Sequence, residues 1–202
     1  MYKTIIFDIG GVIIDFSEGM YISYLSKKLG LSSRYLSAIV LPLVVEMEYG
    51  RMTLRVAEKE FSKGIMVPES RLYFVEAVRK LAKVNRNVVR FMRRLGSRYN
   101  LGIISNISHA RYTEFGKLAI DSLVGSGAVK KVVASCLVGM RKPDARIYRL
   151  AIKELDAEPN ETVFIDNQHE NVIGAERVGI RGITFTGYHK LVSDLEKLGI
   201  GY

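Results

Sequence analysis

The stretch KTIIFDIGG, residues 3–11, joins a short apolar run to a carboxylate and two glycines. Residues 3–7, Lys-Thr-Ile-Ile-Phe, are largely β-branched or aromatic, which is typical of a buried strand, and the run stops at Asp8. Ligands bind beyond the carboxyl ends of the strands in open α/β folds, and glycines there allow close backbone approach. The stretch therefore predicts a first strand that ends in a functional site.

Further segments along the chain have the same strand pattern, and helical patterns separate them. The predicted strands are residues 100–105, 131–135, 162–165 and 182–186. The predicted helices are residues 87–98, 145–155 and 168–178, with Gly179 as a left-handed cap on the last of them. Alternating strands and helices imply right-handed βαβ units, so the fold class is α/β with a parallel sheet flanked by helices.

Residues 17–84 interrupt this alternation, because they contain helical patterns and no convincing strand. The predicted helices are residues 18–29, 33–48, 54–63 and 68–84. We therefore expect two domains, a core of residues 1–16 and 85–202 and an all-helical cap of residues 17–84. Inserted after the first strand, the cap would cover the site as a lid. Its segment Glu46, Glu48, Tyr49 and Arg51, around Gly50, is a candidate substrate-facing loop.

Polar residues lie at, or just beyond, the ends of four predicted strands. They are Asp8, Ser105-Asn106, Lys142 and Asp166-Asn167. In a parallel sheet these ends converge on one crevice, so the clusters become neighbours. Asp8 can act as a nucleophile, Lys142 can hold an anion, and Asp8 with Asp166 can bind a hard cation such as Mg²⁺. This set of charges suits phosphoryl transfer, in which repulsion between carboxylate and phosphate must be reduced.

The order of four motifs resembles the haloacid dehalogenase (HAD) superfamily, in its phosphatase branch with a helical cap. The motifs are Phe7-Asp8-Ile9-Gly10-Gly11-Val12, Ile104-Ser105-Asn106, Arg141-Lys142-Pro143-Asp144 and Phe164-Ile165-Asp166-Asn167. The segment 139–148 is similar to the subgroup of sugar-phosphate (glucose-1-phosphate-type) phosphatases. The resemblance implies a Rossmann-like core with a C1-type cap, a Mg²⁺ cofactor, and hydrolysis of a small phosphorylated metabolite through an aspartyl-phosphate on Asp8.

Three positions depart from the family pattern. Gly10 stands where most phosphatases of the superfamily have a general-acid aspartate, although the resembled subgroup also has glycine there. A cap residue, His109 or water would then protonate the leaving group. Asn167 and Asn171 stand where the family often has aspartates, so we expect a weaker metal site and not an absent one.

These arguments lead to specific assignments of the site residues. Catalytic roles are predicted for Asp8, Ser105, Asn106 and Lys142. Substrate contacts are predicted for Gly10, Gly11, Ser105, Asn106 and Lys142, and metal ligation for Asp8, Gly10, Asp166 and Asn167.

Composition limits the remaining possibilities. The chain has 202 residues, 48% of them hydrophobic and 25% charged, which describes a globular protein. A single cysteine, Cys136, excludes an intramolecular disulfide and is expected to be buried. The amino-terminal apolar run is too short for a signal peptide, and the apolar residues 36–45 span about half a membrane, so we expect a cytoplasmic protein, monomeric or homodimeric, without a membrane partner.

Other functions remain open beside the phosphatase. Gly10, Asn167 and Asn171 also suit a regulatory protein that binds a phosphorylated ligand with impaired catalysis. A metal-independent 2-haloacid dehalogenase would share the aspartate nucleophile but would not need Lys142 and Asp166. The net charge of +9 does not by itself indicate nucleic acid, and no nucleic-acid partner is expected.

Overall fold

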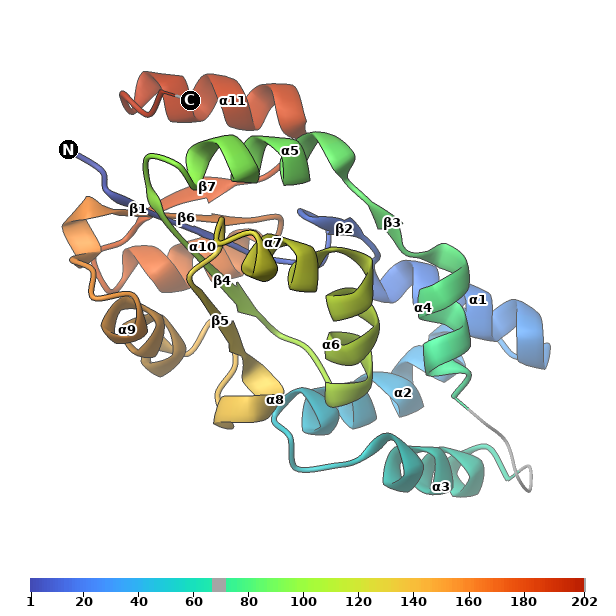
Figure 1. Ribbon diagram of the computed structural model, residues 1–202. Coiled ribbons are helices and arrows are strands. Elements are labelled where there is room, and N and C mark those ends of the chain that lie inside the picture. Colours follow the sequence, from blue (N-terminus) through green and yellow to red (C-terminus); the bar gives the residue numbers. More distant parts are fainter. Residues whose placement is uncertain (67–71, 202) are drawn as a thin grey trace.

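Five parallel strands form the central sheet of the computed structural model, which describes residues 1–66 and 72–201. The strand order is β5-β4-β1-β6-β7, so β1 lies in the middle of the sheet (Figure 1). The strands are β1 (Thr4–Phe7), β4 (Asn100–Ser105), β5 (Lys131–Ala134), β6 (Thr162–Asp166) and β7 (Arg181–Thr184). Each predicted strand is present, with bounds that differ by no more than two residues, and the α/β class is confirmed.

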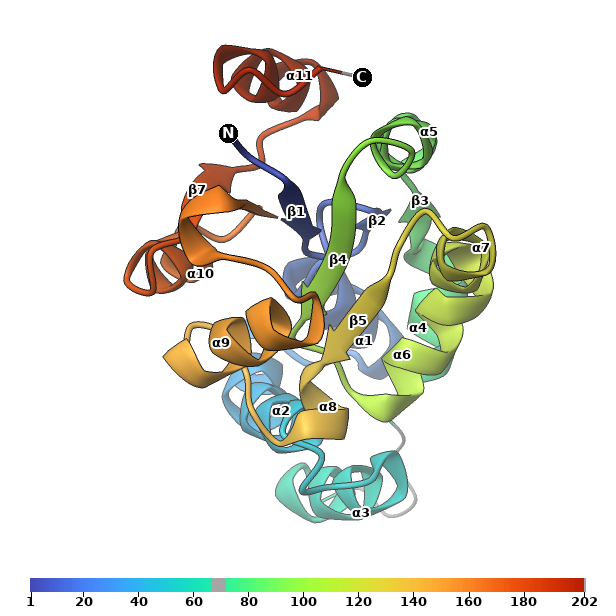
Figure 2. The same ribbon diagram turned by 60° about the vertical axis from the view of Figure 1, so that its left-hand side comes forward.

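Helices cover both faces of this sheet. Those outside residues 17–84 are α5 (Arg86–Leu95), α6 (His109–Phe115), α7 (Asp121–Gly125), α8 (Ser135–Val138), α9 (Ala145–Glu154), α10 (His169–Glu176) and α11 (Tyr188–Lys197), with a π-helical turn η1 (Gly116–Ile120) and a 3₁₀ turn η2 (Pro159–Glu161). In Figure 2, α9 and α10 lie on one side of the sheet and α5 and α7 on the other.

Alternate side chains of the central strand enter two separate cores. Ile5 and Phe7 pack into the larger cluster with apolar residues of α5 and α11, whereas Ile6 packs into a smaller cluster with residues of α9 and α10. All three are fully buried. This period of two is what a strand covered on both faces requires, and it explains why residues 3–7 show no polar alternation.

Four helices occupy most of residues 17–84. They are α1 (Glu18–Leu29), α2 (Ser33–Glu48), α3 (Leu54–Gly64) and α4 (Phe74–Leu81). The first three begin at the predicted residues because Ser17, Ser32 and Thr53 each accept a hydrogen bond from a backbone N–H of the first turn.

The predicted helix over residues 68–84 is wrong at its carboxyl end, and its residues 68–71 lie outside the described part. Lys83–Val84 forms strand β3, which pairs antiparallel with β2 (Ile14–Asp15). The backbone N–H of Asn85 also donates to the carbonyl of Ile13 at 2.9 Å. The chain therefore leaves and re-enters the core side by side through this two-stranded ribbon, and residues 17–84 are not free of strand.

Residues 109–125, for which no element was predicted, form α6, η1 and α7. Ser108 caps α6 by accepting a hydrogen bond from the N–H of Arg111 at 3.3 Å, and this cap places Arg111 in the first turn of the helix. Gly179 has the left-handed φ of 88° predicted for it.

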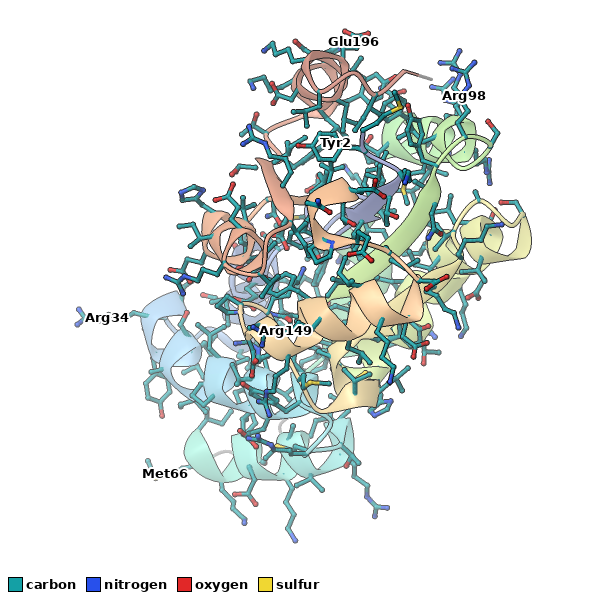
Figure 3. All side chains as sticks on the ribbon, turned by 90° about the vertical axis from the view of Figure 1, so that its left-hand side faces the viewer. Tyr2, Arg34, Met66, Arg98, Arg149 and Glu196 are labelled. Carbon is teal, nitrogen blue, oxygen red and sulfur yellow. The ribbon has the colours of Figure 1, made fainter. Side chains whose placement is uncertain are left out.

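Basic side chains occur on several parts of the surface, and α5 alone carries Arg86, Arg90, Arg93 and Arg94. Arg34, Arg98 and Arg149 project from widely separated parts of the molecule (Figure 3). Within the described ranges, we find no helix with the length and apolar character needed to cross a membrane.

Candidate active site

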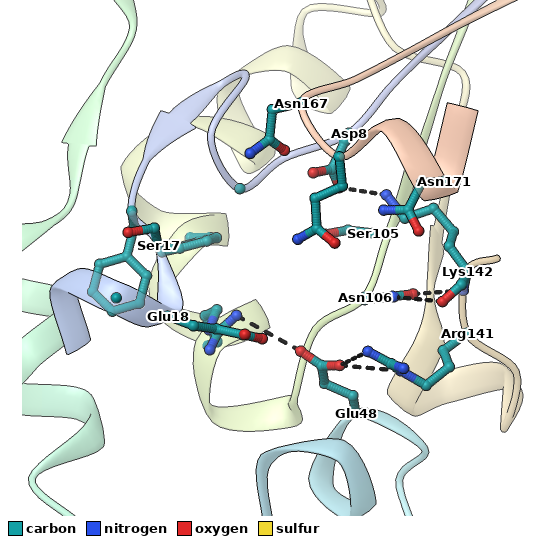
Figure 4. Close-up of a pocket in the computed structure, with 16 residues that line it drawn as sticks. Asp8, Ser17, Glu18, Glu48, Ser105, Asn106, Arg141, Lys142, Asn167 and Asn171 are labelled. Carbon is teal, nitrogen blue, oxygen red and sulfur yellow. Dashed lines mark hydrogen bonds and ion pairs between the residues drawn. The ribbon is translucent and has the colours of Figure 1, made fainter. Parts of the chain in front are cut away.

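A polar cavity of about 320 Å³ lies at the carboxyl ends of β1 and β4 (Figure 4). This volume is near the lower end for small-molecule sites. Core loops and the helices of residues 17–84 both line it. The lining residues are Asp8, Gly10, Phe16, Ser17, Glu18, Gly19, Glu48, Ser105, Asn106, Arg111, Phe115, Arg141, Lys142, Asn167, Gln168 and Asn171.

A buried lysine joins two carboxylates on one side of this cavity. The Lys142 Nζ donates to Asp8 Oδ1 at 2.7 Å, to Asp166 Oδ2 at 2.6 Å and to the carbonyl of Ile104 at 3.0 Å. The exposed fractions are 6% for Asp8, 1% for Lys142 and 0% for Asp166. The structure thus brings together three predicted residues that are up to 158 positions apart in the sequence, as Asp8 and Asp166 are.

The buried cluster of Asp8, Lys142 and Asp166 has one more negative than positive charge. Burial raises the pKa of Asp8 to about 6, with Lys142 lowering it and Asp166 raising it further. Burial also opposes the charge on Lys142, but the two carboxylates outweigh this effect and raise its pKa. Lys142 therefore stays protonated at neutral pH, and Asp8 is a carboxylate held in an environment that disfavours its charge.

Asp166 is held by the loop that follows its strand. The backbone N–H of Gln168 donates to Asp166 Oδ1 at 2.7 Å, and Asn171 Nδ2 donates to Asp166 Oδ2 at 3.0 Å. An aspartate at position 171 would place another carboxylate against Asp166, whereas the amide supplies a donor. The departure of Asn171 from the family pattern therefore has a local reason.

Asn106 fixes the position of Lys142. Its Nδ2 donates to the carbonyl of Lys142 at 2.9 Å, and its Oδ1 accepts from the N–H of Lys142 at 2.7 Å. Ser135, which was not predicted as a site residue, holds the loop that carries Asn106, because its hydroxyl accepts from the N–H of Ile107 at 2.9 Å. Ser105 ends β4, is buried and lines the cavity.

The two predicted glycine contacts differ in position. Gly10 lines the cavity, whereas Gly11 is not among its lining residues. Gly11 has a φ of 80°, and a Cβ there would lie 2.5 Å from Nδ2 of Asn167. The lack of a Cβ at Gly11 therefore leaves room for the Asn167 side chain, and the substrate contact of Gly11 stays a prediction.

The oxygen donors around Asp8 suit a hard divalent cation: Asp8, Gly10 and Asn167 line the cavity, whereas Asp166 is fully buried and is joined to Asp8 through Lys142. Carboxylate oxygens of Asp8 and Asp166, the amide oxygen of Asn167 and the carbonyl of Gly10 are the ligand types that Mg²⁺ takes, usually with one or two carboxylates and substrate phosphate. In the described ranges we find no group of three His, Cys, Asp or Glu side chains that could hold a metal. The uncompensated buried negative charge is what a cation would neutralise, so the residues fit Mg²⁺.

A second charged cluster, of Glu48, Arg111 and Arg141, lies on another wall of the cavity, and it was not predicted from the sequence. Glu48 of α2 is only 2% exposed, and its Oε2 accepts from Arg141 Nη2 at 2.9 Å and from Arg141 Nε at 3.3 Å. Arg111 Nη1 lies 3.8 Å from Glu48 Oε1. Of the predicted substrate-facing loop, Glu48 alone lines the cavity, since Glu46 pairs with Arg51 near the surface.

His109, a candidate proton donor in the sequence, lies elsewhere. It is exposed at the start of α6 and lines a different cavity, with Met47 and Met52. Its position gives it no access to Asp8 through the cavity that Asp8 lines.

The comparisons with known proteins place the chain among hydrolases. Residues 2–179 match the haloacid dehalogenase-like hydrolase family, and the chain belongs to that family. It is 40% identical over 67 residues to a sesquiterpene phosphatase of Aspergillus oryzae, covering 33% of this chain and 34% of that protein. It is 36% identical over 80 residues to flavin mononucleotide hydrolase 1 of Arabidopsis thaliana, covering 40% of this chain and 33% of that protein. These matches span about a third of each relative.

The fold has a close counterpart among solved structures. A HAD family enzyme of Bacteroides thetaiotaomicron superposes with a TM-score of 0.80 at 18% identity, covering 94% of this chain and 98% of that one. The same enzyme has also been solved with magnesium and inorganic phosphate. This likeness confirms the Rossmann-like α/β fold.

Proposed function

We propose that this chain is a Mg²⁺-dependent phosphatase that hydrolyses a small phosphorylated metabolite through an aspartyl-phosphate on Asp8. The observation that carries the proposal is the buried cluster of Asp8, Lys142 and Asp166 beside a polar cavity of about 320 Å³. The names of the two curated relatives, a phosphatase and a flavin mononucleotide hydrolase, support the same reaction class. The resemblance to sugar-phosphate phosphatases makes a sugar phosphate the proposed substrate.

In the first step, an Asp8 oxygen attacks phosphorus while the bond from phosphorus to the leaving oxygen breaks. The leaving oxygen takes a proton, and the aspartyl-phosphate remains on the protein. Water then attacks phosphorus and the bond to Asp8 breaks, which releases inorganic phosphate and restores the carboxylate. Mg²⁺, held by Asp8, Asp166, Gly10 and Asn167, would reduce the repulsion between carboxylate and phosphate.

The other site residues prepare this attack. Lys142 supplies a fixed positive charge beside Asp8, and Asn106 holds the backbone of Lys142 in place. Ser105 donates its hydroxyl to the phosphate. Glu48 is engaged in its ion pair with Arg141 at 2.9 Å, so we assign protonation of the leaving group to Glu18, a further carboxyl group on the cavity wall, or to water.

We expect residues 17–84 to act as the cap of this site and residues 1–16 and 85–202 as its core. Support comes from the ribbon of β2 and β3 at the boundary, and from Glu18 and Glu48, which line the cavity from the helical segment.

Removal of divalent metal should abolish turnover. We expect hydrolysis of p-nitrophenyl phosphate in the presence of MgCl₂ to fall by about a hundredfold or more in EDTA, because several kcal/mol of charge stabilisation is lost. Excess MgCl₂ should restore it, and EDTA already saturated with Mg²⁺ is the control. Full activity in EDTA would contradict the metal site. Tight binding of phosphate analogues without turnover of any phosphate ester would favour the regulatory phospho-ligand-binding protein instead.

A further inference from the structure

We propose that the cavity contains a second anion site, formed by Arg111 and Arg141, which binds a carboxylate or a second phosphate on the leaving group. The inference rests on the proposed phosphatase function and names its substrate class: a small phosphomonoester whose other end is also anionic. Arg141 belongs to the motif of residues 141–144, whereas Arg111 and Glu48 lie outside the four motifs, so the pairing of the two arginines on this wall is a property of this chain.

Arg111 is a buried cation with unused donors. Its exposed fraction is 8%, and among the described residues its Nε and Nη2 have no hydrogen-bond partner. Its guanidinium carbon lies 5.4 Å from the ring centre of Phe16 and 5.0 Å from that of Phe74. These rings stabilise the charge but accept no conventional hydrogen bond. Because buried polar groups left unpaired are costly, the site lacks an acceptor that a ligand could bring.

Arg141 brings a second cation to the same wall. Glu48 orients it through Nε and Nη2, and the Arg141 side chain is still 25% exposed. A guanidinium has five N–H groups, so most of its donors remain beyond those two bonds. Arg111, Arg141 and Glu48 together carry one net positive charge, which suits an anion, and Glu18 is the further glutamate among the residues that line this cavity.

The two charged clusters lie at different ends of the cavity. Figure 4 shows Asp8 toward the upper end and Glu48 and Arg141 toward the lower end, with Asn106 between them. A phosphate at Asp8 would therefore direct the rest of the substrate toward the arginines. Phe16 and Phe115 are the large apolar side chains among the lining residues. The wall is thus too polar for a terpenoid chain, so the name of the Aspergillus relative does not indicate this substrate.

Binding of phosphonates tests the inference without turnover. The probes are ω-carboxyalkyl phosphonates with one to four methylene groups, each compared with the alkyl phosphonate that has a methyl group in place of the carboxylate. Calorimetry in MgCl₂ measures the affinity of both members of each pair. At one chain length, the carboxyalkyl phosphonate should bind about tenfold to a hundredfold tighter than its methyl partner, because charge-assisted hydrogen bonds can supply that difference.

Variants assign that preference to the arginine. Arg111→Met should reduce the ratio of the two affinities at least about tenfold, and Arg111→Lys, which keeps the charge, should retain an intermediate ratio. Arg90→Met removes an exposed arginine of α5 and should leave the ratio unchanged. Folding of each variant is checked by its thermal melting.

Two results would overturn the inference: no preference for the carboxylate at any chain length, or equal weakening of both probes by Arg111→Met. Neither depends on catalysis, because the C–P bond of these probes is not hydrolysed. A failure of the phosphatase proposal would instead appear as absent p-nitrophenyl phosphate turnover with the phosphonate preference intact.

Discussion

Asp8→Asn should abolish phosphatase turnover and at the same time stabilise the metal-free protein at neutral pH. The amide cannot attack phosphorus, so we expect turnover to fall by about four orders of magnitude or more. Stability should rise because burial raises the pKa of Asp8 to about 6, which means that folding disfavours the ionised carboxylate. A pKa raised by roughly two units sets an upper limit of about 3 kcal/mol on the gain in the free energy of unfolding. The weaker hydrogen bond between Lys142 and the amide reduces this gain to about 1–2 kcal/mol.

The dependence on pH checks the cause of that gain. A raised pKa in the folded state contributes stability below the pKa of the unfolded chain and loses it as pH rises through the folded value. The difference in the free energy of unfolding between Asp8→Asn and the original chain should therefore be largest above about pH 7. It should shrink as the pH falls from about 6 to about 4. Urea denaturation in EDTA measures it. A variant that is less stable than the original at pH 7.5 would contradict the charge argument.

Lys142→Met should destabilise the protein strongly and remove activity. It leaves the buried carboxylates of Asp8 and Asp166 without their shared cation and the carbonyl of Ile104 without its donor. Removing one partner of a buried ion pair costs about 3–5 kcal/mol, mostly because a charge stays buried and unpaired. Urea denaturation at pH 7.5 in EDTA gives the change in the free energy of unfolding, and Lys130→Met, at an exposed position, is the matched control.

A double variant separates charge from packing. Adding Asp8→Asn to Lys142→Met removes one of the two unpaired carboxylates, so part of the lost stability should return although activity does not. If packing of the lysine stem caused the loss, the second substitution would restore nothing.

Most of the fold could be predicted because local signals and tertiary structure agree. Ser17, Ser32 and Thr53 mark helix starts by chemistry that acts within one turn, and the structure places those starts at the predicted residues. The uninterrupted apolar runs indicated strands covered on both faces. The ribbon of β2 and β3 was missed because two-residue strands carry no period, and Val84 continued an apolar helical pattern.

The site was predictable for residues at strand ends and for Lys142, which lies seven residues beyond the predicted strand 131–135. Asp8, Ser105 and Asp166 lie at or directly after strand ends, and the parallel sheet brings those ends together. Arg111 and Glu48 lie on helices, and their meeting with Arg141 depends on how α2 packs over the core. No spacing rule relates Glu48 to Arg141, 93 positions further along. The sequence offered Glu48 as a candidate, but its burial and its two arginine neighbours needed the structure.

Covalent trapping tests the central proposal, attack by Asp8 on phosphorus, most directly. The enzyme is mixed with p-nitrophenyl phosphate and MgCl₂, quenched in acid during turnover and reduced with borohydride, which converts an aspartyl-phosphate into homoserine. Mass spectrometry of the peptide that contains residues 3–11 should show homoserine at position 8 in the original chain and none without substrate. Continued turnover with an unmodified Asp8, or homoserine at another aspartate, would contradict the account.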